Sequence, residues 1–355
     1  MIVIPKAFLR TVLTLELAVI GVCVAGVAGH ALWLWFRSRA DAPRLARGHA
    51  ALAAALVAVP DLDQARVAEL RGLPRRVRAA VVDQLAVSVT GEEGRRMAEV
   101  ATTLGLVAAA QRRCRSRRWW RRLLGAHQLN VHGGGDDIFP RLFDDPHPAV
   151  RAQAIEWAGD AQHPDLASRL VAALGDSSAL CRRTAADSIL RAGASLVGAL
   201  AGELGACAGQ QQADLLAVLA RRPDPRYGPA ALAAVTDALP ALRAAAAALL
   251  GGVGGASAGA ALRSLLADDE AAVRAAAADG LRRLQLEEAV PDLAPLLRDP
   301  DFAVRKAAGA ALAALGPGGT LLLRHYAADA DPFAADMARH SLDVAALRRA
   351  GVTLH

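Results

Sequence analysis

Aromatic residues and cysteines are scarce in this sequence. Phe, Trp and Tyr make up 4% of its 355 residues, and the four cysteines are Cys23, Cys114, Cys181 and Cys207. The cysteines show no Cys-x-x-Cys or zinc-ribbon spacing. We interpret them as small buried apolar residues in a reducing compartment.

Motifs for catalysis are also missing. No serine lies in a Gly-x-Ser-x-Gly elbow, and the glycines at 133–135 belong to no Gly-Lys-Ser/Thr phosphate loop. His127 and His132 are five residues apart, but no second pair of ligands accompanies them. We therefore predict no catalytic residue, no cofactor and no metal, and a protein that is not an enzyme.

Alanine and leucine are what the sequence has in abundance. Hydrophobic residues make up 54% of the chain, and most of them are Ala or Leu, which are among the strongest helix formers. β-Branched residues, which favour strands, contribute little of this content. The composition predicts an all-α protein.

Charge is distributed unevenly along the chain. Residues 1–122 carry 20 Lys and Arg against 9 Asp and Glu, whereas residues 123–355 carry 21 against 26. A basic first part favours attraction to anionic lipid. Because nucleic-acid binding needs basic residues along the binding face, we expect no nucleic-acid partner.

A long apolar run lies near the N-terminus. Residues 11–36 include one formally charged residue, Glu16, and as a helix they would span about 39 Å against a hydrocarbon core of about 30 Å. Trp33 and Trp35 stand at its far end, as interfacial aromatic residues do. A cleaved signal peptide is the alternative, with Gly26-Val27-Ala28 as its cleavage site. Because the apolar run continues beyond that site, we predict a transmembrane helix.

Basic residues on either side of this run predict its orientation. They are Lys6 and Arg10 before it, and Arg37, Arg39, Arg44 and Arg47 just after it. Because the more positive flank stays on the cytoplasmic side, we expect a single-pass protein of the cytoplasmic membrane. Everything after residue 36 would then lie in the cytoplasm.

An internal repeat occupies much of the remaining chain. Equivalent arginines recur at gaps of 31, 61, 31 and 31 residues, and an Asp precedes each of them by six residues. These pairs are Asp145 and Arg151, Asp176 and Arg182, Asp237 and Arg243, Asp268 and Arg274, and Asp299 and Arg305. The double gap places a degenerate copy around Gln212 and Ala213.

We expect each Asp to lie in the turn between two paired helices, where it accepts the first backbone N–H groups of the second helix. Each Arg lies one turn into that second helix and can reach an Asp of its own or the neighbouring repeat. Stacked pairs would form a ladder along the inside of a solenoid. We interpret this ladder as structural, because it sets the register of the repeats.

The pattern Asp-Pro-x-x-x-Val-Arg-x-x-Ala, as it stands at Asp145 and Asp299, resembles the short bacterial HEAT repeats, also called PBS-lyase HEAT-like repeats. The resemblance implies an α-solenoid of helix pairs. It implies less about function, because the family includes scaffolds, adaptors and some chromophore lyases. The predicted organisation is a flank at 1–10, a transmembrane helix at 11–36, a basic irregular helical region at 37–117 and a solenoid at 118–350.

Residues 112–122 hold seven arginines and two tryptophans. We expect Trp120 to pack in the core of a repeat, and the arginines before it to stay solvated near anionic lipid. The candidate lipid-facing residues are Arg112, Arg113, Arg115, Arg117 and Arg118.

The predicted function is a membrane-tethered scaffold or adaptor that binds a protein partner on the concave face made by the second helices. Candidate contacts are the residues there that vary between copies: Gln153, Glu156, Trp157, Arg183, Asp187, Asp214 and Arg282. Because the copy near Gln212 lacks both ladder residues, we expect the partner near the centre of the array. Two alternatives stay open, a chromophore lyase or isomerase and a lipid-surface sensor that uses the Arg/Trp segment.

Overall fold

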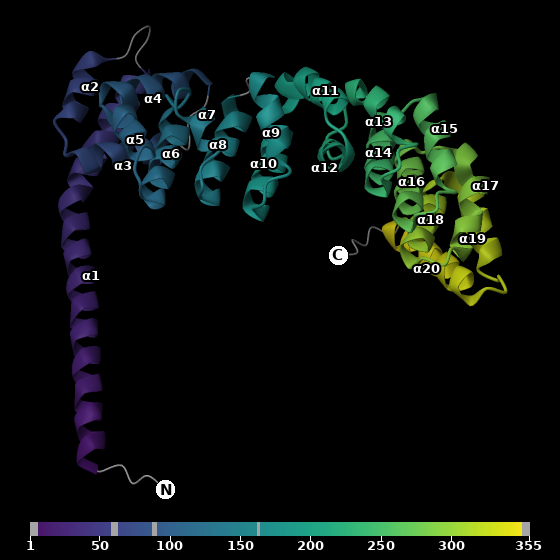
Figure 1. The fold of residues 1–355 in the computed structure, drawn as a ribbon, viewed down its shortest axis with the longest axis horizontal. Helices are drawn as coiled ribbons and strands as arrows, with labels where there is room; N and C mark the ends of the chain where they lie inside the picture. The colour runs from purple at the N-terminus through teal and green to yellow at the C-terminus, as the bar shows by residue number, and fades with distance from the viewer. Residues whose placement is uncertain (1–5, 58–62, 87–90, 162–163, 350–355) are drawn as a thin grey trace. The chain divides into compact units, whose positions relative to one another are not determined.

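The computed structural model describes the backbone of residues 6–57, 63–86, 91–161 and 164–349. Side chains are described for these residues except 6–18, 21, 164, 348 and 349. All regular elements within these ranges are helices, which confirms the all-α prediction. The chain forms two compact units, residues 1–138 and 139–355 (Figure 1).

The first unit has six helices in its described part. They are α1 (Lys6–Val57), α2 (Gln64–Arg71), α3 (Arg75–Ala86), α4 (Gly91–Thr103), α5 (Leu106–Cys114) and α6 (Trp119–His132). Their shared core is built from buried aliphatic residues such as Leu52, Val81, Val100 and Leu129.

Helix α1 has two different parts. From Asp41 onward it packs into the unit, where Nε and Nη2 of Arg76 donate to the two carboxylate oxygens of Asp41 at 2.8 and 2.9 Å. These hydrogen bonds hold the pKa of Asp41 below its ordinary value. The described side chains from residue 19 to 36 are all exposed. Of the predicted transmembrane segment 11–36, the side chains of residues 11–18 and 21 lie outside the described set.

One helical stretch among the described residues is long and apolar enough to cross a membrane, Ala179–Ala206. It comprises α10 (Ala179–Ala192), a 3₁₀ turn and α11 (Val197–Ala206), and its apolar side chains contribute to the core of the second unit. We assign this stretch to the solenoid, and the transmembrane helix at 11–36 stays a prediction.

The second unit is a stack of helix pairs, as the repeat predicted. The first helices of the pairs are α7 (Phe139–Leu142), α9 (Ala167–Ala173), α11, α13 (Gly228–Ala234), α15 (Ala256–Leu265), α17 (Val290–Leu293) and α19 (Gly316–Tyr326). The second helices are α8 (Pro148–Ala161), α10, α12 (Gly209–Leu219), α14 (Pro240–Val253), α16 (Ala271–Leu284), α18 (Phe302–Ala314) and α20 (Pro332–Arg349). Short 3₁₀ turns, from η1 (Pro164–Leu166) to η5 (Ala294–Arg298), extend several first helices.

Neighbouring second helices pack against one another and form one layer of the unit. Small residues allow this close approach: a Cβ added to Gly251 of α14 would stand 2.5 Å from the Cα of Gly280 in α16. The two backbones are therefore in contact at these glycines. An Ala-rich sequence suits such packing, because a larger side chain would push the helices apart.

The two compact units meet between residues 138 and 139, inside the predicted solenoid, whose start at residue 118 stays a prediction. Helix α6 packs against α3 and α5. The cause is Gly125, where an added Cβ would lie 2.7 Å from the carbonyl oxygen of Ala110, so that α5 and α6 form a close helical hairpin.

Candidate functional site

Arg274 shows the geometry of a complete ladder rung. Its Nε and Nη2 donate to the carboxylate of Asp299 in the next repeat, at 2.7 and 2.9 Å. Its Nη1 donates to the carbonyl oxygens of Asp268 and Asp269 in its own turn, at 2.7 and 2.9 Å. One guanidinium therefore binds the carbonyl groups of its own turn and the carboxylate in the turn of the next repeat.

Two more rungs repeat this arrangement. Arg151 donates to the carboxylate of Asp176 at 2.8 and 2.7 Å, and Arg243 to that of Asp268 at 2.7 Å through both nitrogens. In all three rungs the carboxylate comes from the neighbouring repeat, 25 residues further along the chain. The ladder thus links repeats, as a structural role requires.

The rungs lower the pKa of their carboxyl groups. For Asp176 and Asp268 the main cause is the hydrogen bonding from the paired arginine. At Asp299 burial is the largest effect and raises the pKa, but hydrogen bonds from Arg274 and the backbone N–H of Asp301 together outweigh it. These three carboxylates are therefore ionised at neutral pH.

The ladder aspartates cap turns rather than helix ends, which corrects our expectation. Asp268 accepts the backbone N–H of Glu270 at 3.0 Å, and Asp176 that of Ser178 at 2.7 Å. Both donors lie just before the second helix, because an Asx-type bond spans two residues.

Arg182 has the same turn contacts but no carboxylate. Its Nη1 donates to the carbonyl oxygens of Asp176 and Ser177 at 2.8 and 3.1 Å. At the position where the other rungs have an Asp, 25 residues further on, stands Cys207. No described residue binds Nε or Nη2 of Arg182, and its side chain is exposed. Leu180, two residues earlier on the same helix, is 51% exposed.

Arg305 is the second open rung. Its Nη1 donates to two carbonyl oxygens of its own turn at 2.8 and 2.9 Å, and Ala330 stands where the carboxylate would be. Asp329, one residue earlier, binds Arg298 instead, with its Oδ2 accepting from Nη2 at 2.5 Å. Within the described part of the chain, no carboxylate binds Arg305.

Exposed aromatic rings flank this second open rung. The Cζ of Arg305 lies 5.8 Å from the ring centre of Phe302 and 5.1 Å from that of Phe333. The two rings are 61% and 65% exposed. Two large exposed rings around one guanidinium are typical of a binding surface.

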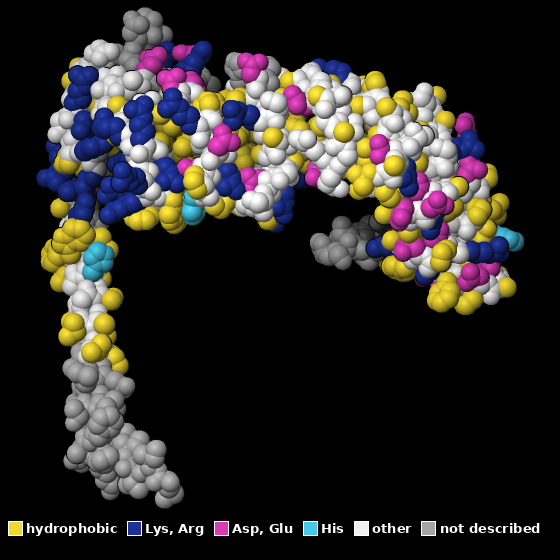
Figure 2. All heavy atoms as spheres, viewed as in Figure 1, with side chains coloured by type: hydrophobic (Ala, Val, Ile, Leu, Met, Phe, Trp, Pro, Cys, Tyr) yellow, Lys and Arg dark blue, Asp and Glu magenta, His cyan; other side chains and the backbone are white. Residues whose placement is uncertain are grey.

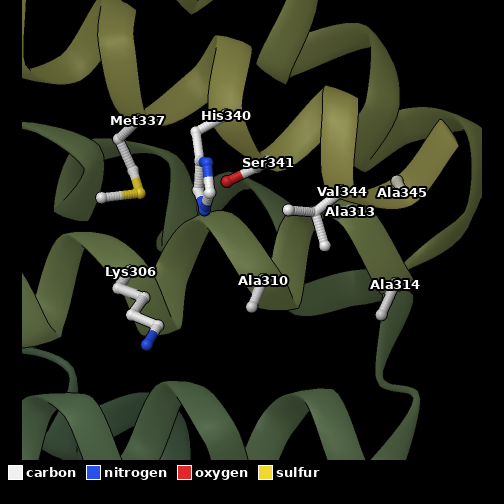
Figure 3. Close-up of a pocket in the computed structure, with 9 residues that line it drawn as sticks. All are labelled: Lys306, Ala310, Ala313, Ala314, Met337, His340, Ser341, Val344 and Ala345. Atoms are coloured by element: carbon white, nitrogen blue, oxygen red, sulfur yellow. The ribbon is translucent and has the colours of Figure 1, made fainter. Parts of the chain in front are cut away.

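An apolar groove of about 380 Å³ lies beside these rings, between α18 and α20 (Figure 3). Its lining is Ala310, Ala313 and Ala314 of α18 and Met337, Val344 and Ala345 of α20, with Lys306, His340 and Ser341 as the polar members. Figure 3 shows Met337 and His340 projecting from α20 toward α18. The groove exists because α18 presents alanines where larger side chains would fill the space. Sequence reasoning missed it, and those alanines were the available signal.

The predicted partner contacts fall into two groups. Trp157 is half-buried: its ring stacks on that of Phe139 with 4.9 Å between the ring centres and packs against the core, and its role in binding stays a prediction. Gln153 donates to Glu156 at 2.8 Å on the surface of α8.

The remaining predicted contacts lie on the surface of α10, α12 and α16. Arg183 and Asp187 are exposed on α10. Asp214 accepts from Gln210 at 2.7 Å, and Arg282 is held by Asp279 of its own helix at 2.7 Å. Their role in binding stays a prediction.

Trp120 is not in the core, contrary to our expectation. It is 51% exposed and its neighbour Trp119 is 40% exposed, because the first turn of α6 projects beyond the helices against which the rest of α6 packs. Of the candidate lipid-facing residues, Arg113 is half-buried and donates to Gln128. The other four, Arg112, Arg115, Arg117 and Arg118, are exposed.

The two histidines near residue 130 lie in different environments. His127 is exposed, whereas His132 is buried with its Nε2 2.6 Å from Oδ1 of Asp83. Among the described residues, no three His, Cys, Asp or Glu side chains are placed to hold a metal ion.

A family profile described as HEAT repeats matches residues 135–201 and 259–343. These two segments of the chain match HEAT repeats. The unmatched stretch between the two segments includes α12, whose repeat lacks both ladder residues. No curated protein matches the chain.

Three solved structures are similar to this chain at low identity. An engineered protein has 17% identity and a TM-score of 0.38, with 84% of this chain and 99% of that one covered. Human deoxyhypusine hydroxylase in complex with glycerol has 19% identity and a TM-score of 0.32, with 80% and 96% covered. The complex of CpcE and CpcF of phycocyanin lyase from Nostoc sp. PCC7120 has 18% identity and a TM-score of 0.36, with 59% and 94% covered. At these values none of them bears on the function of this chain.

Proposed function

We propose that this protein is a non-enzymatic scaffold that holds an acidic segment of a protein partner on its layer of second helices, while α1 tethers it to the cytoplasmic membrane. Its HEAT repeats support an interaction scaffold. The observation that carries the proposal is the pair of ladder arginines, Arg182 and Arg305, that bind no carboxylate among the described residues.

The open rungs are preorganised for a carboxylate. At Arg182 the Nη1 atom is fixed by two carbonyl oxygens, as it is at Arg274. At Arg274 the other two nitrogens, Nε and Nη2, bind a carboxylate in two parallel charge-assisted hydrogen bonds. A carboxylate from a partner completes the same fork at Arg182 without further ordering of the arginine.

The surface around Arg305 adds an apolar anchor. Phe302 and Phe333 are exposed beside the guanidinium, and the groove between α18 and α20 begins at Lys306, the next residue on α18. At protein interfaces, a few large apolar side chains and arginines contribute most of the binding energy. A partner segment with acidic and apolar residues fits this surface.

The tether rests on the exposed part of α1. Val22 and Val27 are 73% and 72% exposed in this helix, and leaving such side chains in water costs about 25 cal/mol for each Å² of apolar surface. A bilayer removes that cost. The basic residues that follow residue 36 favour a cytoplasmic position for both compact units.

Photo-crosslinking in the cells that produce the protein tests the scaffold. A photoreactive amino acid replaces Leu180, two residues before Arg182, or Phe333, whose ring lies beside Arg305, in the full-length chain. The control replaces Leu321 on the first helix α19, which is 68% exposed. We expect the first two positions, and not the control, to capture one partner whose crosslinked peptide contains Asp or Glu.

Equal crosslinking at all three positions, or a captured peptide without an acidic group, would contradict the proposal. The tether is tested separately by alkaline carbonate washing of membranes, after which the full-length protein should stay in the pellet. Release into the supernatant would contradict the tether and leave the scaffold untouched.

A further inference from the structure

The turn between α5 and α6 exposes an unusual amount of apolar surface. Trp119, Trp120 and Leu124 are 40%, 51% and 47% exposed, and the two indole rings contact each other edge to face with 6.2 Å between their centres. Exposed large apolar side chains that cluster mark a surface that meets another phase or molecule. Indole rings in particular favour the boundary between headgroups and hydrocarbon.

The same turn carries a dense positive charge. Five exposed arginines surround the rings, and none forms an ion pair with a described residue. They are Arg112, Arg115, Arg117, Arg118 and Arg121. Figure 2 shows Lys and Arg side chains gathered over the first unit around the place where α1 leaves it (Figure 2). A surface that combines indole rings with unpaired guanidinium groups is complementary to anionic lipid headgroups.

Contacts between α3 and α1 show which end of the unit adjoins the exposed apolar part of α1. Arg76, at the start of α3, binds Asp41 of α1. Further along both helices, Gly48 of α1 packs against Val81 of α3. Through its bond to Asp41, Arg76 holds the start of α3 at the end of the unit from which the exposed part of α1 departs.

Helix α6 begins at that same end. Its last residue, His132, is bonded to Asp83 near the end of α3, and Figure 1 shows α6 reaching toward the side on which α1 leaves the unit. At about 1.5 Å per residue, Trp119 lies about 20 Å before His132, whereas Arg76 lies about 10 Å before Asp83. The start of α6 therefore projects beyond Arg76.

The projection places the two pairs of tryptophans near one level. The start of α6 extends about 9 Å beyond Arg76, which corresponds to about six residues of α1 before Asp41. Six residues before Asp41 stands Trp35, and the guanidinium of Arg39 lies over the ring of Trp35 at 4.3 Å. By this helix-rise count, Trp119 and Trp35 lie near the same level along α1, on two different helices of one unit.

We infer that the α5–α6 turn, residues 112–124, docks on the anionic headgroups of the membrane that α1 crosses. The inference rests on the proposed tether and adds a second contact with the bilayer. Guanidinium groups bind the lipid phosphates, and the two indole rings enter the interface. Two attachments fix the orientation of the first unit on the membrane, which one helix alone leaves free to rotate.

Quenching of tryptophan fluorescence by brominated lipid tests the docking. The full-length protein, with Trp33, Trp35 and Trp157 replaced by Phe, is placed in phosphatidylcholine vesicles or in vesicles that also contain phosphatidylglycerol. Its emission then comes from the α5–α6 turn. We expect strong quenching in the anionic vesicles and less than about half of it in the neutral ones.

Charge reversal supplies the matched comparison. Replacement of Arg115, Arg117 and Arg118 by Glu should reduce quenching in anionic vesicles to the neutral level. The control reverses two exposed arginines at the far end of the unit, Arg66 and Arg95, and should leave quenching unchanged. Arg95 belongs to that end because its neighbour Arg96 donates to the carbonyl oxygen of Leu56 at 3.0 Å.

Salt gives a second measurement that needs no charge reversal. Raised ionic strength should weaken the quenching of the chain in which only Trp33, Trp35 and Trp157 are replaced. Quenching that ignores lipid charge, salt and the arginines of the turn would overturn the inference. Flotation separates this outcome from failure of the tether. A tethered chain floats with both kinds of vesicle, whereas a chain held only by the turn floats with the anionic ones alone.

Discussion

Two stretches of the solenoid contain the same arginine in different surroundings. Arg274 and Arg182 both lie one turn into a second helix, and both close their own turn through Nη1. What differs is the residue 25 positions further on, which is Asp299 for the first and Cys207 for the second. The comparison teaches that one residue type is structural where the next repeat supplies a carboxylate, and free to bind where it does not.

The largest expected effect on stability is at a closed rung, which is one whose arginine binds a carboxylate of the next repeat. Arg274→Ala removes both hydrogen bonds to Asp299, whose side chain is 8% exposed. Leaving a mostly buried carboxylate without its counter-charge should lower the free energy of unfolding by about 2–3 kcal/mol. Denaturation by urea, followed by circular dichroism, measures the change.

Arg282→Ala is the control for this substitution. Arg282 pairs with Asp279 on the surface of α16, and exposed pairs of this kind contribute less than about 0.5 kcal/mol. Equal losses from Arg274→Ala and Arg282→Ala would show that the ladder has no special structural role.

Acid should weaken the closed rungs next. The pKa of Asp176, Asp268 and Asp299 is lowered in the folded protein. Their contribution to stability is therefore present above the unfolded pKa of about 4, and it is lost as the pH falls through the lower folded pKa values. We expect the free energy of unfolding to fall below about pH 4, and to fall less steeply in Asp299→Asn. Parallel curves for the two proteins would contradict this assignment.

The smallest expected effect on stability is at the open rung. Arg182→Ala removes two hydrogen bonds to carbonyl oxygens from an exposed side chain and leaves no carboxylate unpaired. The free energy of unfolding should change by less than about 1 kcal/mol. A loss as large as that of Arg274→Ala would mean that Arg182 has a structural partner and is not free to bind.

Sequence spacing predicted the helix pairs, the ladder positions and the degenerate copy, because all three depend on a fixed period. It left open which Asp each Arg would bind, since that choice depends on the distance between stacked turns. It missed the groove between α18 and α20, which depends on how far apart two alanine-lined helices pack. It misplaced Trp120, because its exposure depends on where the neighbouring helices end rather than on local pattern.

The most direct test of the account measures the affinity of the crosslinked partner segment for variants of the open rung. Arg182→Ala should weaken binding by at least about tenfold, the loss expected for one charge-assisted bidentate contact. Arg324→Ala, on the exposed surface of the first helix α19, should change it by less than about threefold. Replacement of the segment's carboxylate by an amide should weaken binding to the unmodified protein and add nothing in Arg182→Ala. Equal affinity of the Arg182→Ala and Arg324→Ala variants would contradict the account.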